Sequence, residues 1–250
     1  MGKKTRFLAL IMLIIFIGGY QSCDWFTPKT DTPPDTCPSW DTDCDNISNA
    51  VETNSANSYL GLDPNSPNAN PSIAHGYPCN GWIEKALNLV NSGTGYYHYL
   101  GTDPIDTDDW GVLHLINMIE GAGREWYSNG YTPPKIGVGD MSKGNAETQE
   151  FGGDWRPDHK CHQNGLEVDI RYVRNDEKEI GLDIGSADSI YYDVDATIAL
   201  MNFLIQNGSV TEIILSPYAG IQGEVVVEDT TGKHDDHFHV EIEDPDGTGN

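Results

Sequence analysis

The sequence predicts an α+β fold in which a small antiparallel sheet of about four strands is combined with flanking helices and long loops. Short segments with the apolar pattern of strands are separated in the sequence by longer segments with helical periodicity. The 250 residues include 27 Gly and 14 Pro, a composition that favours many turns. With 38% hydrophobic residues, the chain can bury one main core, and we expect a single domain preceded by an appendage.

Three helices and four strands are predicted in chain order. Helical spacing of apolar residues predicts helices at 82–90, after Asn80, at 110–119 and at 195–206, the last ending before Gly208. Strands are predicted at 135–138, 166–173, 212–216 and 237–242. These elements lie in a main domain that we expect to span residues 75–250.

The N-terminus has the form of a secretory signal. Basic residues at positions 3, 4 and 6 precede an apolar run at 7–17, which is short for a membrane span. Residues 1–22 are therefore predicted to be a signal peptide, and Ser22-Cys23 resembles a bacterial lipoprotein processing site with Cys23 as the lipidated residue. A plain secretory signal or an uncleaved anchor are the alternatives. The Pro-, Thr- and Asp-rich residues 23–40 are predicted to be a flexible tether, so the protein is expected outside the cytoplasm, in the periplasm or at the cell surface.

The charge is strongly acidic, with 39 acidic and 14 basic residues and a net charge of -25. Nucleic acid is therefore excluded as a partner, because phosphate binding needs a basic surface. Within the segment 41–74, a twelve-residue stretch has the ligand spacing of a Ca²⁺ loop and resembles thrombospondin type 3 repeats. The predicted ligands at positions 1, 3, 5, 7, 9 and 12 are Asp41, Asp43, Asp45, Ile47 through its carbonyl, Asn49 and Glu52. At position 6, Asn46 tolerates the left-handed turn; a chance match in an acidic linker is the alternative.

Four cysteines remain if Cys23 carries a lipid, and disulfides persist outside the cytoplasm. Four cysteines allow three pairings. We favour Cys37 with Cys44 and Cys79 with Cys161, because each pair then stays within one predicted module.

Five of the eight histidines fall in two short windows, 159–162 and 234–239. The period of two along each predicted strand places Asp169 on one polar face and His239 on another. If the two strands are neighbours, these side chains meet, and His162 joins them from the preceding turn. Two imidazoles and one carboxylate leave a fourth position for water, as in catalytic zinc sites.

The two remaining histidines of the second window, His234 and His237, are predicted to act as general base and as hydrogen-bond donors to the oxyanion. Asp235 and Asp236 are expected to orient them. The alternatives are a solvated polar sheet face or a structural metal.

At these windows the chain resembles the penicillin-insensitive murein endopeptidases, zinc peptidases of the LAS group. The resemblance is carried by Gly139-Asp-Met-Ser142, Gly152-Gly153, His159-Lys-Cys-His162 through Asp169, and His234-Asp-Asp-His237-Phe-His239. It implies a zinc ion bound by His162, Asp169 and His239, catalytic roles for His237 and His234, and a place in the site for His159. It also implies cleavage of D-alanyl cross-links in peptidoglycan on a small antiparallel sheet.

Other residues near the motifs have weaker signals. Asp140 and Ser142 are predicted to shape the cleft, with a simple turn as the alternative. Arg171 shares a face with Asp169 and is predicted to hold a substrate carboxylate, with a surface ion pair as the alternative. Cys161 departs from the family pattern, and a reactive thiol near the metal is the alternative to its disulfide.

The sequence thus predicts a zinc endopeptidase, attached to the membrane by a lipid, that cuts peptidoglycan cross-links. One alternative is a non-catalytic lipoprotein that binds the cell wall. Another is a D-alanyl carboxypeptidase of the same group.

Overall fold

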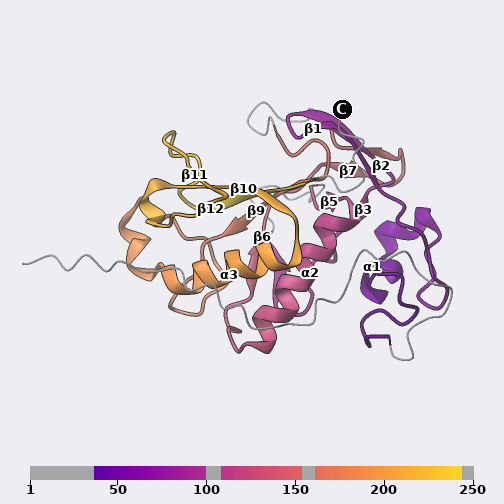
Figure 1. Ribbon diagram of the computed structural model, residues 1–250, viewed down its shortest axis with the longest axis horizontal. Coiled ribbons are helices and arrows are strands. Elements are labelled where there is room, and N and C mark those ends of the chain that lie inside the picture. The colour runs from indigo at the N-terminus through magenta and orange to yellow at the C-terminus, as the bar shows by residue number, and fades with distance from the viewer. Residues whose placement is uncertain (1–36, 100–107, 154–160, 244–250) are drawn as a thin grey trace, which may run out of the picture. The chain divides into compact units, whose positions relative to one another are not determined.

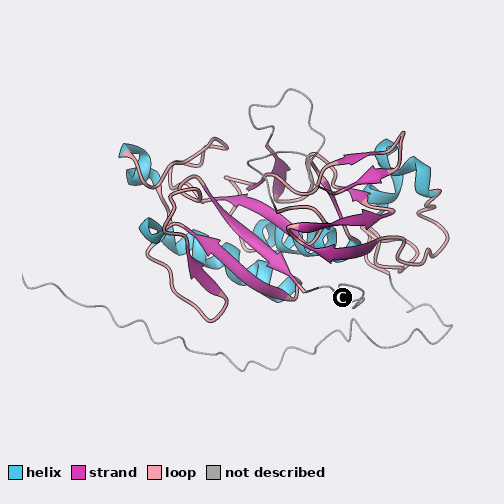
Figure 2. Ribbon diagram, turned by 90° about the horizontal axis from the view of Figure 1, so that it is seen from above, coloured by secondary structure: helices cyan, strands magenta, loops and turns pink. Residues whose placement is uncertain are grey.

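The computed structural model describes residues 37–99, 108–153 and 161–243. These described residues belong to one compact unit. Its centre is a six-stranded sheet with two long helices against one face (Figures 1 and 2). The predicted α+β class is confirmed, although the sheet is larger than expected and mixed. Each edge strand runs parallel to its neighbour, while the four inner strands are antiparallel.

The elements have the following bounds. The main sheet contains, in spatial order, β11 (Val226–Glu228), β10 (Val210–Leu215), β12 (His237–Ile242), β9 (Glu167–Arg171), β6 (Ile136–Val138) and β4 (Tyr96–His98). Two-stranded sheets pair β1 (Ile73–Tyr77) with β2 (Asn80–Glu84), β3 (Leu87–Asn88) with β5 (Trp110–Gly111), and β7 (Gly144–Asn145) with β8 (Glu150–Phe151). The α-helices are α1 (Asn49–Thr53), α2 (Leu113–Ser128) and α3 (Val194–Asn207), and 3-10 turns lie at Ser55–Leu60, Ala187–Tyr191 and Pro217–Ala219.

The four predicted strands form the inner, antiparallel part of the main sheet. Alternate side chains along these strands point to opposite faces of the sheet. Those on one face, such as Val168 and Ile170 of β9 and Phe238 and Val240 of β12, are fully buried in the core that α2 and α3 cover. The intervening polar residues therefore lie on the opposite face of the sheet. The edge strands β4 and β11, of three residues each, were not predicted.

Two of the predicted helices are confirmed with changed ends. Asp193 caps α3 by accepting a hydrogen bond from the amide of Ala196 at 3.0 Å, which fits the predicted start near residue 195. Helix α2 begins at Leu113, because Trp110 instead pairs with Asn88 in a short sheet. It continues to Ser128, and Trp126 extends its buried stripe.

The helix predicted at 82–90 is wrong. Residues 80–84 form strand β2 of a hairpin, with Ala74 opposite Ile83 and His75 opposite Trp82. The backbone of Lys85 then adopts a left-handed φ of 53°, which interrupts any helix. Ile83 is buried whereas Trp82 is half exposed, so the apolar spacing comes from strand alternation followed by an irregular buried segment.

The N-terminal part of the described chain packs into the same compact unit as the sheet. Ile47 and Val51 are buried in the common core, and the hydroxyl of Ser48 donates to Glu120 of α2 at 3.0 Å. The predicted boundary at residue 75 stays a prediction. Among the described residues, no helix is both long and apolar enough to cross a membrane. The predicted signal peptide, Cys23 and His159 lie outside the described residues.

Candidate metal centre

The pairing of β9 with β12 brings the two histidine windows together. Their antiparallel register places His239 opposite Asp169 and His237 opposite Arg171. These residues belong to the polar face of the sheet, away from the helices. The predicted meeting of the two strands is therefore present in the structure.

His162 reaches this face from the turn that precedes β9. Its Nε2 lies 3.4 Å from Asp169 Oδ1, and Nδ1 of His239 lies 2.9 Å from the same oxygen. One ligand atom from each of the three residues lies within 4.8 Å of the others, and all three residues are buried. Ligands of a tetrahedral zinc ion stand about 3.3 Å apart for bonds of about 2.0 Å, so the donor types and spacing fit zinc.

Glu167 is a site residue that the sequence did not reveal. Its Oε1 lies 3.2 Å from Nε2 of His239, and its Oε2 accepts a hydrogen bond from the backbone amide of His162. The backbone of His162 has a left-handed φ of 67°, which is rare for a residue other than glycine. Glu167 therefore orients two of the proposed ligands, and its position two residues before Asp169 on the same strand face was the available signal.

The electrostatics of the cluster favour a cation. Burial raises the pKa of Asp169, but His237 and His162 outweigh this effect and hold it well below its usual range. Burial lowers the pKa of His239, but its hydrogen bonds to Asp169 and Glu167 raise it to about 10. Two carboxylates thus favour positive charge at this ring, and a bound metal ion would satisfy the same demand.

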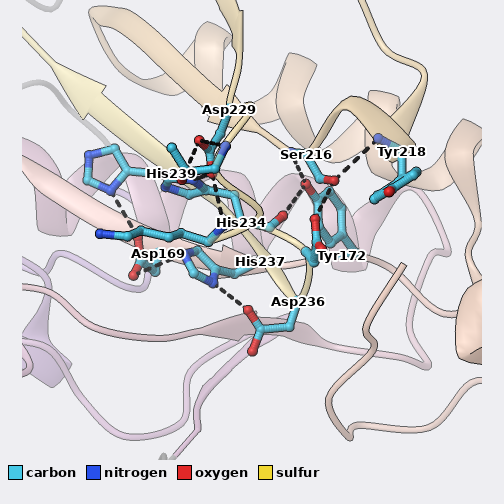
Figure 3. Close-up of polar contacts among 12 residues, drawn as sticks. Asp169, Tyr172, Ser216, Tyr218, Asp229, His234, Asp236, His237 and His239 are labelled. Carbon is cyan, nitrogen blue, oxygen red and sulfur yellow. Dashed lines mark hydrogen bonds and ion pairs between the residues drawn. The ribbon is translucent and has the colours of Figure 1, made fainter. Parts of the chain in front are cut away.

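The two other histidines stand beside the cluster, each held by a carboxylate (Figure 3). Nδ1 of His237 lies 2.7 Å from Asp236, and its Nε2 lies 3.5 Å from Oδ2 of Asp169. Nδ1 of His234 lies 2.8 Å from Asp229. The two rings are 5.0 Å apart between centroids. Burial lowers the pKa of His237, and Asp169 and Asp236 raise it above its ordinary value overall.

The carboxylates near these histidines only partly follow the expectation. Asp236 orients His237, as predicted, whereas the partner of His234 is Asp229, from the preceding loop. Asp235 instead accepts a hydrogen bond from the hydroxyl of Ser216 at 2.6 Å, so it anchors the loop. Tyr172 also holds this loop by donating to the backbone oxygen of His234 at 3.0 Å.

The residues with weaker signals surround the cluster in different ways. The backbone oxygen of Asp140 accepts a hydrogen bond from the amide of Asp169 at 2.9 Å, whereas Ser142 is fully buried and accepts one from the amide of Gly165. The guanidinium of Arg171 lies 3.5 Å from the ring centroid of Tyr99. Because Arg171 lies opposite His237 in the pairing of β9 with β12, it is next to the metal centre. This position is compatible with binding a substrate carboxylate.

Both predicted disulfides are present, Cys37–Cys44 and Cys79–Cys161. The second ties the turn of the β1–β2 hairpin to the residue before His162. The amide of Gln163 also donates to Pro78 at 2.9 Å, which strengthens the same link. Cys161 is therefore a structural anchor of the ligand loop and not a reactive thiol.

A second cluster lies in the acidic loop. Ligand atoms of Asp41, Asp43 and Asp45 stand within 4.8 Å of one another. Burial, and then the charges of these three aspartates, raise the pKa of Glu52 to about 7. The side-chain oxygen of Asn49, another predicted ligand of this loop, accepts a hydrogen bond from the amide of Thr42 at 3.0 Å.

Comparison with known proteins adds a family to this geometry. The sequence profile of the penicillin-insensitive murein endopeptidases matches residues 74–188, which confirms the resemblance. No curated protein matches the chain. The match supports a peptidase that hydrolyses peptidoglycan, and that substrate together with two disulfides indicates a place outside the cytoplasm. The matched residues include His162 and Asp169 but not the second histidine window, which β-sheet pairing brings to them.

Proposed function

We propose that this chain, whose residues 74–188 match the penicillin-insensitive murein endopeptidase family, is a zinc-dependent endopeptidase that hydrolyses D-alanyl cross-links of peptidoglycan. The observation that carries the proposal is the meeting of His162, Asp169 and His239 on the polar face of β9 and β12. Two further imidazoles stand directly beside this set. A solvated sheet face would not need buried, mutually paired ligands.

The proposed ligands are His162, Asp169 and His239. Zinc held by these residues would supply Lewis acidity toward the scissile carbonyl and would lower the pKa of the attacking water. Glu167 keeps the ring of His239 in one orientation through Nε2.

His237 is the proposed general base and acid. Its Nδ1 is held by Asp236, so Nε2 is the nitrogen that points toward the ligand set. That nitrogen accepts the proton of the attacking water and delivers it to the leaving amine. The carboxylate of Asp169 stabilises the imidazolium between the two transfers.

His234 is the proposed donor to the oxyanion. Asp229 fixes its Nδ1, and hydrogen bonds outweigh burial to lower the pKa of this carboxyl, so it stays ionised. Nε2 of His234 then donates to the carbonyl oxygen as negative charge develops. Arg171 is proposed to bind a carboxylate of the peptide stem.

The test uses the purified chain and isolated sacculi. Inductively coupled plasma mass spectrometry should find about one zinc per chain, and mass spectrometry of the muropeptides should show cross-linked dimers split into monomers. Loss of one terminal D-alanine from monomers would instead identify the carboxypeptidase. Binding to sacculi without any product, by zinc-loaded protein, would identify the non-catalytic lipoprotein and contradict the proposal.

We propose further that Cys23 carries a lipid that attaches the enzyme to a membrane. The sequence Ser22-Cys23 after the apolar run motivates this proposal. Cys23→Ser should move the protein from the membrane fraction to the soluble fraction. An unchanged distribution would contradict lipidation at this residue.

A further inference from the structure

The acidic loop contains buried carboxylate oxygens that no donor satisfies. Both oxygens of Asp43, and Oε2 of Glu52, are out of contact with solvent and have no hydrogen-bond partner among the described residues. Glu52 is only 5% exposed. A buried ionised oxygen without a partner is costly, so these atoms point to a ligand that the protein chain does not supply.

The unsatisfied oxygens belong to a group of neighbouring carboxylates. Asp43 belongs to the set whose ligand atoms lie within 4.8 Å of one another, together with Asp41 and Asp45. Glu52 is joined to this set by Asn68, whose side-chain amide donates to Glu52 at 3.0 Å and whose backbone amide donates to Asp45. The charges of Asp45, Asp43 and Asp41 also act on the carboxyl of Glu52 and raise its pKa, so this fourth carboxylate lies near the other three.

The loop backbone is shaped to hold these side chains in place. Asp41 accepts the amides of Asp45 and Asn46, and Asn46 adopts the left-handed conformation, with φ of 68°, that the sixth position of such a loop requires. The disulfide Cys37–Cys44 closes the same segment. The four carboxylates are thus preorganised although they repel one another.

We infer that Asp41, Asp43, Asp45 and Glu52 bind one Ca²⁺ ion, and that this ion fastens the N-terminal segment to helix α2 of the peptidase unit. Ca²⁺ is favoured over Mg²⁺ because a loop rich in carboxylates suits its larger coordination number and flexible geometry. Asn49 is not a direct ligand, which revises the set that the loop spacing predicts, and the carbonyl of Ile47 remains a predicted ligand.

Contacts next to the loop explain how the ion would attach the N-terminal segment to α2. Ile47 and Val51 are fully buried in the common core, and the amide side chain of Asn117, on α2, donates to the backbone oxygen of Asn46 at 2.9 Å. Ser48 links the loop to Glu120 of the same helix. Neutralising the negative charges of the loop therefore stabilises the whole compact unit.

The experiment measures thermal unfolding of the full zinc-loaded chain in Ca²⁺-free buffer, with CaCl₂ or MgCl₂ as the probe. We expect CaCl₂ to raise Tm by about 5 to 10 °C once its concentration exceeds Kd about a hundredfold, which is about 10 to 100 mM for sites of extracellular type. Isothermal titration calorimetry should give about one Ca²⁺ per chain. Equal shifts with MgCl₂, or none with CaCl₂, would overturn the assignment.

The variants separate a ligand role from a structural one. Asp43→Asn should abolish the Ca²⁺ shift, and in Ca²⁺-free buffer it should melt at or above wild type because one repelling charge is gone. Glu52→Gln provides an independent second measurement, and the exposed Asp188→Asn is the matched control that keeps the full shift. A retained shift in both ligand variants would overturn the inference. The same shift in His162→Ala would show that it does not arise at the proposed zinc site.

Discussion

The metal centre and the acidic loop are both clusters of ligand side chains, but they differ in how their charges are balanced. In the metal centre, carboxylates and imidazoles alternate, and Asp169 and Glu167 each face ring nitrogens of His239 at 2.9 and 3.2 Å. In the acidic loop, all four side chains are carboxylates, and the oxygens of Asp43 face no donor.

This difference predicts different roles for the two clusters. The side chains of the metal centre are already held in place, whereas the acidic loop needs a bound ion to be stable. The metal centre sits on strands of the main sheet, and its side chains hold one another in position through opposite charges. The acidic loop has only like charges, so its folded conformation costs electrostatic free energy until a cation binds. Perturbing the first cluster should therefore change activity, and perturbing the second should change stability.

The largest expected effect is the loss of a proposed zinc ligand. His162→Ala should remove bound zinc and lower hydrolysis of sacculi by about a thousandfold or more, because the Lewis acid is lost. Metal analysis and muropeptide release measure the two quantities. The exposed Glu224→Gln should leave both unchanged. Activity that survives in zinc-free His162→Ala would disprove the role of this cluster in catalysis.

A smaller loss is expected when proton transfer alone is removed. His237→Ala should retain one zinc per chain, while kcat falls by about a hundredfold to ten-thousandfold, since general acid–base catalysis contributes that much. The comparison of zinc content with kcat distinguishes this residue from a ligand. Loss of zinc together with turnover would instead make His237 part of the ligand set.

The sequence predicted most of the metal centre because the relevant pattern is simple. Alternation along residues 166–171 and 237–242 placed the polar side chains on one face, and the structure pairs these strands in the register that brings Asp169 to His239. The acidic loop was equally visible, since all its residues are contiguous. The positive φ of Asn46 agrees with its place in the loop.

What the sequence did not reveal depends on tertiary contacts. Glu167 looked like an ordinary alternating polar residue, and its role depends on the turn that brings the backbone of His162 to it. Asp229 reaches His234 only because the intervening loop folds back. The helix expected at 82–90 failed for a related reason: a partner strand at 73–77 offered backbone hydrogen bonds that periodicity alone cannot anticipate.

Glu167 offers a sharper test of the charge balance in the metal centre. Glu167→Gln should weaken zinc binding by about 10- to 100-fold, the usual cost of losing a carboxylate that orients a histidine ligand. Competition with a chromogenic chelator measures the affinity. Glu224→Gln is the matched control, because Glu224 is exposed to solvent and makes the same change of charge. If the two variants bind zinc equally well, orientation by Glu167 does not contribute.

The smallest expected effect concerns Glu120, which accepts a hydrogen bond from Ser48 beside the acidic loop and is one of the α2 residues that contact this segment. Burial raises its pKa above the ordinary 4.5, and the groups facing it, Ser48, Arg124 and Tyr96, offset this only in part. The folded protein then binds a proton that the unfolded chain has released, so the unfolding free energy should fall as pH rises above 4.5. Glu120→Gln cannot titrate, so its stability relative to wild type should increase with pH across that window. Urea unfolding at saturating Ca²⁺ from pH 4.5 to 8 measures this difference, and a constant difference would show that Glu120 titrates normally.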